Sequence, residues 1–218
     1  MKKTEVIVDT CFLQKLSSEG KKPENIKTIL SEFDFVPIAH PYIIEHELSM
    51  KSYSEKMIKD GYIKKIEYVE FLKDDYDRHL YESYFFQLHE DLRLYLKAKE
   101  GPKQIKKLAL HSNQNIYDTH IQGSSMGDVH MILMAAFMHL PIILTEDSDI
   151  DLLRSLAKKR TNLGQYTLEI YDAWDLIKQI AEKQETDISK KELEQILNEM
   201  GERPRRSEMK TIWNNHHM

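Results

Sequence analysis

The chain of 218 residues carries 31 lysines and arginines against 36 aspartates and glutamates, for a formal net charge of −5. This balance excludes a strongly basic nucleic-acid-binding protein, and the length suits one large domain, or one domain with appendages. A single cysteine, Cys11, excludes an internal disulfide framework, so we expect a reducing, intracellular and cytoplasmic environment. No apolar stretch reaches the ~20 residues of a membrane helix, so no membrane partner is expected. The absence of G-x-G-x-x-G and P-loop motifs excludes the standard dinucleotide and P-loop sites.

Short apolar runs alternate with helical spacing along the chain. Residues 6–8, 35–38, 142–144 and 166–171 are typical of buried strands, while residues 26–33 and 129–137 repeat apolar side chains at helical intervals. This alternation predicts an α/β fold with a mostly parallel central sheet and helices on both faces, a three-layer α/β/α sandwich. Pro37 weakens the second strand or places it where the missing N–H does no harm.

The segment 54–102 is charged and rich in tyrosine, and we interpret it as a helical insertion or cap. Its helical stripe is Leu80, Tyr84, Leu88 and Tyr95. Within the segment, residues 63–68 fit either a helix or a short extra strand, because their spacing does not distinguish the two.

The C-terminal part shows two helix starts. Asp172 and Asp175 are spaced like an N-cap and its third-position partner, and Ser189 opens a capping box for a last helix that ends at Gly201. The residues from Glu202 onward are polar and are expected to form a mobile tail. We therefore divide the chain into a domain at 1–183 and a C-terminal helical extension with a polar tail at 184–218.

Four acidic residues stand where a site is expected in such a fold. Asp9 follows the first apolar run, Glu47 lies in the helical stretch after the second, Asp128 starts the helix before the third, and Asp147 follows the third run with Asp149 behind it. Ligands of open parallel sheets bind outside the carboxyl ends of the strands, so these acids are expected to converge at one edge. Because crowded carboxylates repel each other, a hard cation such as Mg²⁺ or Mn²⁺ is the expected cofactor.

The ordered acidic segments resemble the motifs of PIN-domain nucleases. These segments are Val6-Ile7-Val8-Asp9-Thr10, Ile43-Ile44-Glu45-His46-Glu47-Leu48, Gly127-Asp128-Val129-His130 and Leu144-Thr145-Glu146-Asp147-Ser148-Asp149. The resemblance implies a PIN-like fold and a metal-dependent endoribonuclease that hydrolyses phosphodiester bonds by attack of a metal-activated water. Cys11 departs from the family pattern, since many members carry asparagine there.

The resemblance also implies roles for individual residues. Asp9, Glu47, Asp128 and Asp147 become the catalytic acids, and the metal ligands are Asp9, Asp128, Asp147 and Asp149. Glu47 is preferred to Glu45 because the family's acid is commonly followed by leucine, as Glu47 is by Leu48. Candidate substrate contacts are Thr10, Thr145, Lys103, Lys106 and Lys107, the lysines because they flank the acidic site in sequence. The expected partner is RNA, with a homodimer and an inhibitory protein partner left open.

Other interpretations of the same residues remain. Ser125 and Asp128 also read as a plain capping box, and Asp147 and Asp149 as helix-start acids. A catalytically silent PIN-like scaffold that binds RNA or protein and a DNA-directed nuclease are the alternative functions. A haloacid-dehalogenase-type phosphatase needs a second aspartate where Cys11 stands. His130 is expected at a helix surface or partly buried, within reach of a substrate phosphate.

Overall fold

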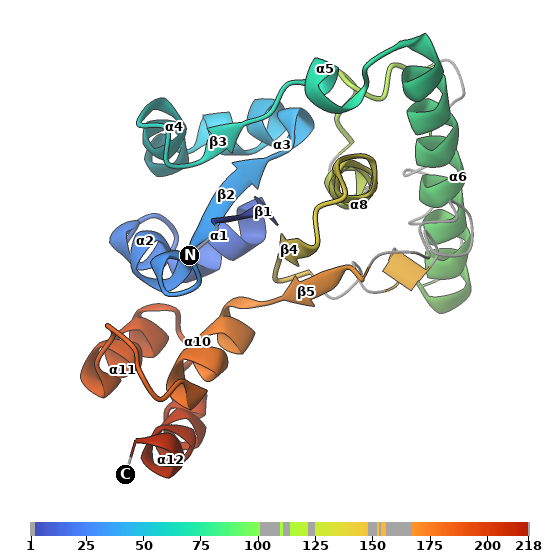
Figure 1. The fold of residues 1–218 in the computed structure, drawn as a ribbon. Coiled ribbons are helices and arrows are strands. Elements are labelled where there is room, and N and C mark those ends of the chain that lie inside the picture. Colours follow the sequence, from blue (N-terminus) through green and yellow to red (C-terminus); the bar gives the residue numbers. More distant parts are fainter. Residues whose placement is uncertain are drawn as a thin grey trace.

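The protein is an α/β fold built on a five-stranded, all-parallel sheet with the order β3-β2-β1-β4-β5 (Figure 1). The computed structural model describes residues 3–100 (their side chains to residue 95), 110, 114–121, 125–147, 152, 154–155 and 167–217. The strands are β1 (Thr4–Val8), β2 (Phe35–Ala39), β3 (Lys64–Lys65), β4 (Ile142–Leu144) and β5 (Glu169–Tyr171). The prediction of a mostly parallel sheet is confirmed.

The central strands form where the apolar runs predict them. Residues 6–8 of β1 and all of β4 are buried, as strands covered on both faces require. Pro37 pairs with Val6 of β1, whereas β3 pairs only with Ile38 and Ala39, so Pro37 lies outside that ladder. The run 166–171, predicted as the fourth strand, corresponds to β5, which is shorter and spans Glu169–Tyr171. Tyr166 lies outside the described residues.

The sheet changes winding direction between β1 and β4. From β1 the chain adds β2 and then β3 on one side, and a long connection then returns it to β4 on the other side of β1. Val8 and Leu144, the last residues of the two strands, are register partners. The carboxyl ends of β1 and β4 therefore open together at a topological switch point, where ligands of such sheets bind.

Short helices follow the first two strands. They are α1 (Thr10–Leu16), α2 (Glu24–Ser31), α3 (Pro41–His46), the 3-10 turn η1 (Leu48–Met50) and α4 (Ser52–Lys59). Pro41 occupies the first turn of α3, where its missing N–H costs nothing, and the His40 ring accepts a hydrogen bond from the Tyr42 N–H. These short connections bring the end of α3 close to the switch point.

The segment 54–102 differs from the predicted helical cap in two respects. It contains α5 (Tyr68–Phe71) and the 26-residue helix α6 (Asp75–Glu100), but also β3, so part of it belongs to the sheet itself. The predicted stripe on α6 is confirmed only in part, because Leu88 is buried whereas Leu80 and Tyr84 are partly buried and Tyr95 is half exposed. The buried face of α6, which packs on α8 (Met126–Met138), consists of Tyr81, Phe85, Leu88, His89 and Leu92.

A buried chain of hydrogen bonds joins α3, α6 and α8. His130 contacts the Ile116 carbonyl through Nε2 (3.1 Å) and the Tyr81 hydroxyl through Nδ1 (2.7 Å), and His40 Nε2 contacts the same hydroxyl (3.1 Å). Because the carbonyl only accepts, His130 Nε2 donates, Tyr81 donates to Nδ1, and His40 donates to Tyr81. The expectation that His130 lies near the helix surface and reaches a substrate phosphate is wrong, since it is fully buried in this network.

The C-terminal extension is helical to residue 216. It follows α10 (Ala173–Glu182) and comprises α11 (Lys190–Glu199), the turn η3 (Arg203–Arg205) and α12 (Arg206–His216). The capping boxes at Asp172 and Ser189 are formed as predicted. The mobile tail expected from Glu202 onward is wrong, because α12 packs against α10 and α11 and buries Met209 completely.

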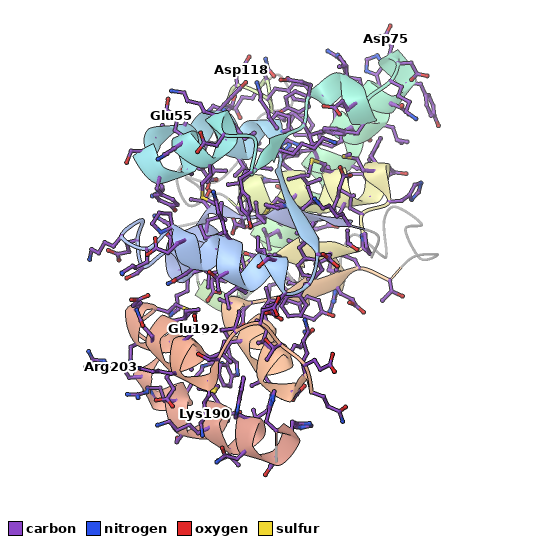
Figure 2. The ribbon with its side chains drawn as sticks, turned by 60° about the vertical axis from the view of Figure 1, so that its left-hand side comes forward. Glu55, Asp75, Asp118, Lys190, Glu192 and Arg203 are labelled. Carbon is purple, nitrogen blue, oxygen red and sulfur yellow. The ribbon has the colours of Figure 1, made fainter. Side chains whose placement is uncertain are left out.

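The extension lies at one end of the molecule. Figure 2 shows Lys190, Glu192 and Arg203 on the C-terminal helices, at the end opposite to Glu55, Asp75 and Asp118. Ion pairs and hydrogen bonds tie it to the N-terminal helices, including Lys15–Glu202 (2.5 Å) and Asn25–Glu199 (3.0 Å). Among the described residues, no helix has the length and apolar character needed to cross a bilayer.

Candidate acidic site at the carboxyl ends of β1 and β4

Asp9 is the first residue after β1 and sits at the centre of the switch point. Its backbone is extended and its N–H donates to the Leu144 carbonyl (3.0 Å), which continues the pairing of β1 with β4 by one residue. As the N-cap of α1, Asp9 also accepts a hydrogen bond at Oδ1 from the Thr10 N–H (2.6 Å). Only 7% of the residue is exposed. Strand pairing and helix capping thus fix the carboxylate in place.

Two side-chain donors hold the second oxygen of Asp9. The Thr145 hydroxyl donates to Oδ2 (2.8 Å), and so does the Cys11 thiol. The Thr145 oxygen in turn accepts from the Asp147 N–H (3.1 Å), and the Cys11 sulfur accepts from the Glu146 N–H (3.2 Å). Asp9 is therefore coupled to the turn that carries Asp147, which places the two aspartates on neighbouring strand ends.

These contacts revise the expected roles of the two threonines. The Thr145 hydroxyl is buried and both donates and accepts, so it positions Asp9 and Asp147 instead of facing a substrate. The Thr10 hydroxyl is also buried but makes no well-formed hydrogen bond. It lies close enough to Glu47 to lower the pKa of that carboxyl, so it points into the acidic site.

Glu47 reaches the site from the junction of α3 and η1. Its side chain comes so near to Gly127 that a Cβ on the glycine would stand 3.0 Å from Oε1 and 2.7 Å from the Ile43 tip. Glu45, two residues earlier, is exposed and lies near Lys65 and Tyr68, whose pKa values its charge raises. The structure places Glu47, and not Glu45, beside Asp9 and Asp128.

Asp128 stands in the first turn of α8 and is 8% exposed. Ser125 at the helix start has a left-handed backbone (φ 52°) and makes no capping hydrogen bond to a helix N–H, so the plain capping box is not formed. The α8 N-terminus instead carries Asp128 toward the other three acids.

Mutual repulsion and burial raise the proton affinity of this cluster. The pKa of Asp128 lies well above its ordinary value because of burial first and then the charges of Asp9, Asp147 and Glu47. Burial also raises the pKa of Asp9; hydrogen bonds oppose this shift and the charge of Asp147 adds to it. The pKa of Glu47 is likewise raised, first by burial and then by the charge of Asp9. Within the described residues no ion pair links Asp9, Glu47 or Asp128 to a lysine or arginine. Uncompensated buried carboxylates of this kind are concentrated at functional sites.

The oxygen atoms of the acidic site suit a hard divalent cation, although the side chains are not arranged as ligands of one ion. Four carboxylates supply only oxygen ligands, as magnesium and manganese prefer, and the buried Thr10 hydroxyl, next to Glu47, is a further oxygen in the site. In the part of the chain that is described, no three histidine, cysteine, aspartate or glutamate side chains are close enough to share an ion. A cation shared by three of these carboxylates would therefore require their side chains to rotate.

Four predicted site residues are not described by the structure. Asp149, Lys103, Lys106 and Lys107 fall outside the described residues. Cys11, where the sequence departs from the family pattern, is a direct hydrogen-bond donor to Asp9, and its own pKa is raised by burial and then by the charge of Asp9. Sequence reasoning missed the close contact at Gly127, for which the only signal is a glycine next to a predicted acid at a helix start.

Comparison with protein-family models, with curated proteins and with solved structures gives no match to the chain.

Proposed function

We propose that the protein is a divalent-metal-dependent endoribonuclease of PIN-like architecture. The observation that carries this proposal is the convergence of Asp9, Glu47, Asp128 and Asp147 at the switch point, where each of three acids has its pKa raised by at least one of the others. Two separate helix groups, one with α1, α2 and α10 and one with α3, α5, α6 and α8, support a three-layer α/β/α arrangement.

The residues divide into two roles. Asp9, Asp128 and Asp147 hold Mg²⁺ or Mn²⁺, and Glu47 completes the site or orients the attacking water. A bound ion would supply Lewis acidity and lower the pKa of a bound water, the chemistry that in-line hydrolysis of a phosphodiester requires. Thr145 and Cys11 orient Asp9 by donating to Oδ2, so they act as positioning residues.

The test is cleavage of a labelled single-stranded RNA with manganese. Asp9→Asn and Glu47→Gln are each expected to lower cleavage at least 100-fold, because each removes a ligand or water-orienting charge. Glu45→Gln is the matched control, since it removes an exposed carboxylate two residues from Glu47 and should cleave like the wild type. Full activity of Asp9→Asn, or equal losses in Glu45→Gln and Glu47→Gln, contradicts the site.

A catalytically silent scaffold is the second candidate. Its specific support is that no three acidic side chains among the described residues already share a cation position. Calorimetry with manganese separates the two functions. Heat of binding that disappears in Asp128→Asn supports the nuclease, and a folded wild type that binds no manganese supports the scaffold. The same cleavage assay with single-stranded DNA distinguishes a DNA-directed enzyme.

A further inference from the structure

An open groove of about 860 Å³ runs beside the acidic site, between α1 and the end of α11. We call it the α1–α11 groove. Its residues come from α1 and the following turn, from the start of α4, from the turn after β4, and from the end of α11. They are Cys11, Gln14, Lys15, Ser18, Glu19, Lys21, Lys51, Glu146, Glu199, Met200 and Gly201. Figure 1 shows α10 and α11 directly next to α1 and α2, so the C-terminal extension supplies one wall.

The groove leads to the acidic site. Cys11, at its inner end, donates through its thiol to Asp9, and Glu146 directly precedes Asp147. Lys51 lines the groove and is near enough to Glu47 to lower the pKa of that carboxyl. A chain molecule lying in the groove therefore passes within reach of the proposed catalytic acids.

The charges that face the groove favour an anionic occupant. Lys21 and Lys51 have no ion-pair partner within the described ranges, whereas the carboxylates are largely engaged. Glu199 accepts from Asn25 and lies 3.6 Å from the Lys22 ammonium, and Glu146 accepts from the Ala173 N–H. Lysines that neutralise phosphates supply the sequence-independent part of polynucleotide binding, so Lys21 and Lys51 are the groove residues suited to that contact.

We propose that the α1–α11 groove binds the sugar-phosphate backbone of a single-stranded polynucleotide and directs it to the acidic site. The proposal rests on the proposed function for the identity of the polyanion. Lys21 and Lys51 contact phosphates, and the turn at Gly201 forms the opposite wall. No aromatic ring lines the groove among the described residues, so the contacts go to the backbone and are independent of base sequence.

The docking of the C-terminal extension makes the groove. Lys15 of α1 pairs with Glu202, and the Asn25 amide of α2 donates to Glu199 of α11. These two contacts connect the N-terminal helices to the C-terminal extension. Gly201 has a left-handed backbone (φ 79°), which lets the chain turn sharply after α11 without steric strain. The extension is thus a substrate-binding element in addition to a packing element.

The test measures fluorescence anisotropy of a labelled single-stranded RNA, with EDTA present so that nothing is cleaved. The double variant Lys21→Gln/Lys51→Gln is expected to bind about 10-fold more weakly at physiological salt. Its slope of log affinity against log salt should be flatter by about 1.4, or about 0.7 per lost phosphate contact. Lys178→Gln is the control, because it removes an exposed lysine on α10 that does not line the groove.

A gain of binding tests the same idea independently of protein folding. Glu19 is the exposed carboxylate of the groove, and Glu19→Gln should tighten binding about 2- to 4-fold.

The groove proposal is overturned if the double variant binds within 2-fold of the wild type, or if Lys178→Gln loses as much affinity as the double variant. Normal binding by the double variant together with loss of cleavage in Asp9→Asn would overturn the groove and leave the nuclease intact. Lysine-dependent binding by a wild type that never cleaves would support the groove and contradict the nuclease.

Discussion

Replacing Asp128 by asparagine removes a buried negative charge without changing the size of the side chain. The pKa of Asp128 in the folded protein is raised above its ordinary value of 3.8 by burial and by three neighbouring carboxylates. The folded state therefore holds the proton at pH values where the unfolded chain has released it. It follows that the contribution of Asp128 to the free energy of unfolding is most favourable at low pH and falls as pH rises from about 3.8 through the folded pKa.

The size of this loss at pH 7 has an upper bound. At most about 3 pKa units separate pH 7 from the unfolded value, and each unit corresponds to about 1.4 kcal/mol, so Asp128 costs at most about 4 kcal/mol. Asparagine keeps part of the local polar contacts and gives up the charge. We expect Asp128→Asn to be about 1–3 kcal/mol more stable than the wild type at pH 7, with little gain at pH 4, while cleavage is lost.

Urea unfolding at pH 4, 5.5 and 7 measures this difference. Asp60→Asn serves as the control, because Asp60 is exposed at the end of α4 and the same substitution there should leave stability nearly unchanged. The reasoning is refuted if Asp128→Asn is less stable than the wild type at pH 7, or if its gain is the same at all three pH values. Manganese at ten times its dissociation constant should add about 1.4 kcal/mol to the wild type and less to Asp128→Asn.

Three further predictions concern other parts of the molecule. Gly127→Ala should lower cleavage while shifting stability by less than about 1 kcal/mol, because helix propensity offsets a clash that displaces Glu47; chemical denaturation and the RNA assay measure the two effects. His130, whose pKa burial lowers to about 3, stays neutral in the folded state, so its stabilising contribution falls as pH drops below 6.5. Its ring signals in NMR should not titrate between pH 8 and 4.5, and a midpoint near 6.5 contradicts the buried network. Met209→Ala should cost about 2–5 kcal/mol in urea unfolding, as for a core residue, whereas a mobile tail would tolerate it.

Local pattern was sufficient for most of the sheet. Residues 6–8, 35–38 and 142–144 are short apolar runs, and burial on both faces leaves little freedom in how such runs pair. The convergence of Asp9 and Asp147 followed from the general rule for parallel sheets, since both come directly after or near a strand end.

The errors arose where tertiary packing chose between equivalent local patterns. Helix α6 carries aromatic and aliphatic residues on two adjacent faces, and only its packing on α8 selects Tyr81 and Phe85 over Leu80 and Tyr84. Helix α12 has no side-chain N-cap and few apolar residues, and it is held by Met209 and by the Arg205 guanidinium, 4.9 Å from the Trp174 ring centre. The burial of His130 depends on partners at Tyr81 and Ile116, which are far away in the sequence.

The order of strands in the sheet has a consequence for synthesis of the chain. β1, β2 and β3 leave the ribosome early, but β4 can dock against β1 only after residues 66–141 have been made, and β5 pairs only with β4. Asp128 and Asp147 therefore join Asp9 and Glu47 late, since such distant contacts form slowly. A nascent chain that ends before residue 128 carries only two of the four acids, Asp9 and Glu47. If the proposed activity holds, products of translation that stop before this point are unable to cut RNA near the ribosome, and this safeguard comes from the order of the acids along the chain.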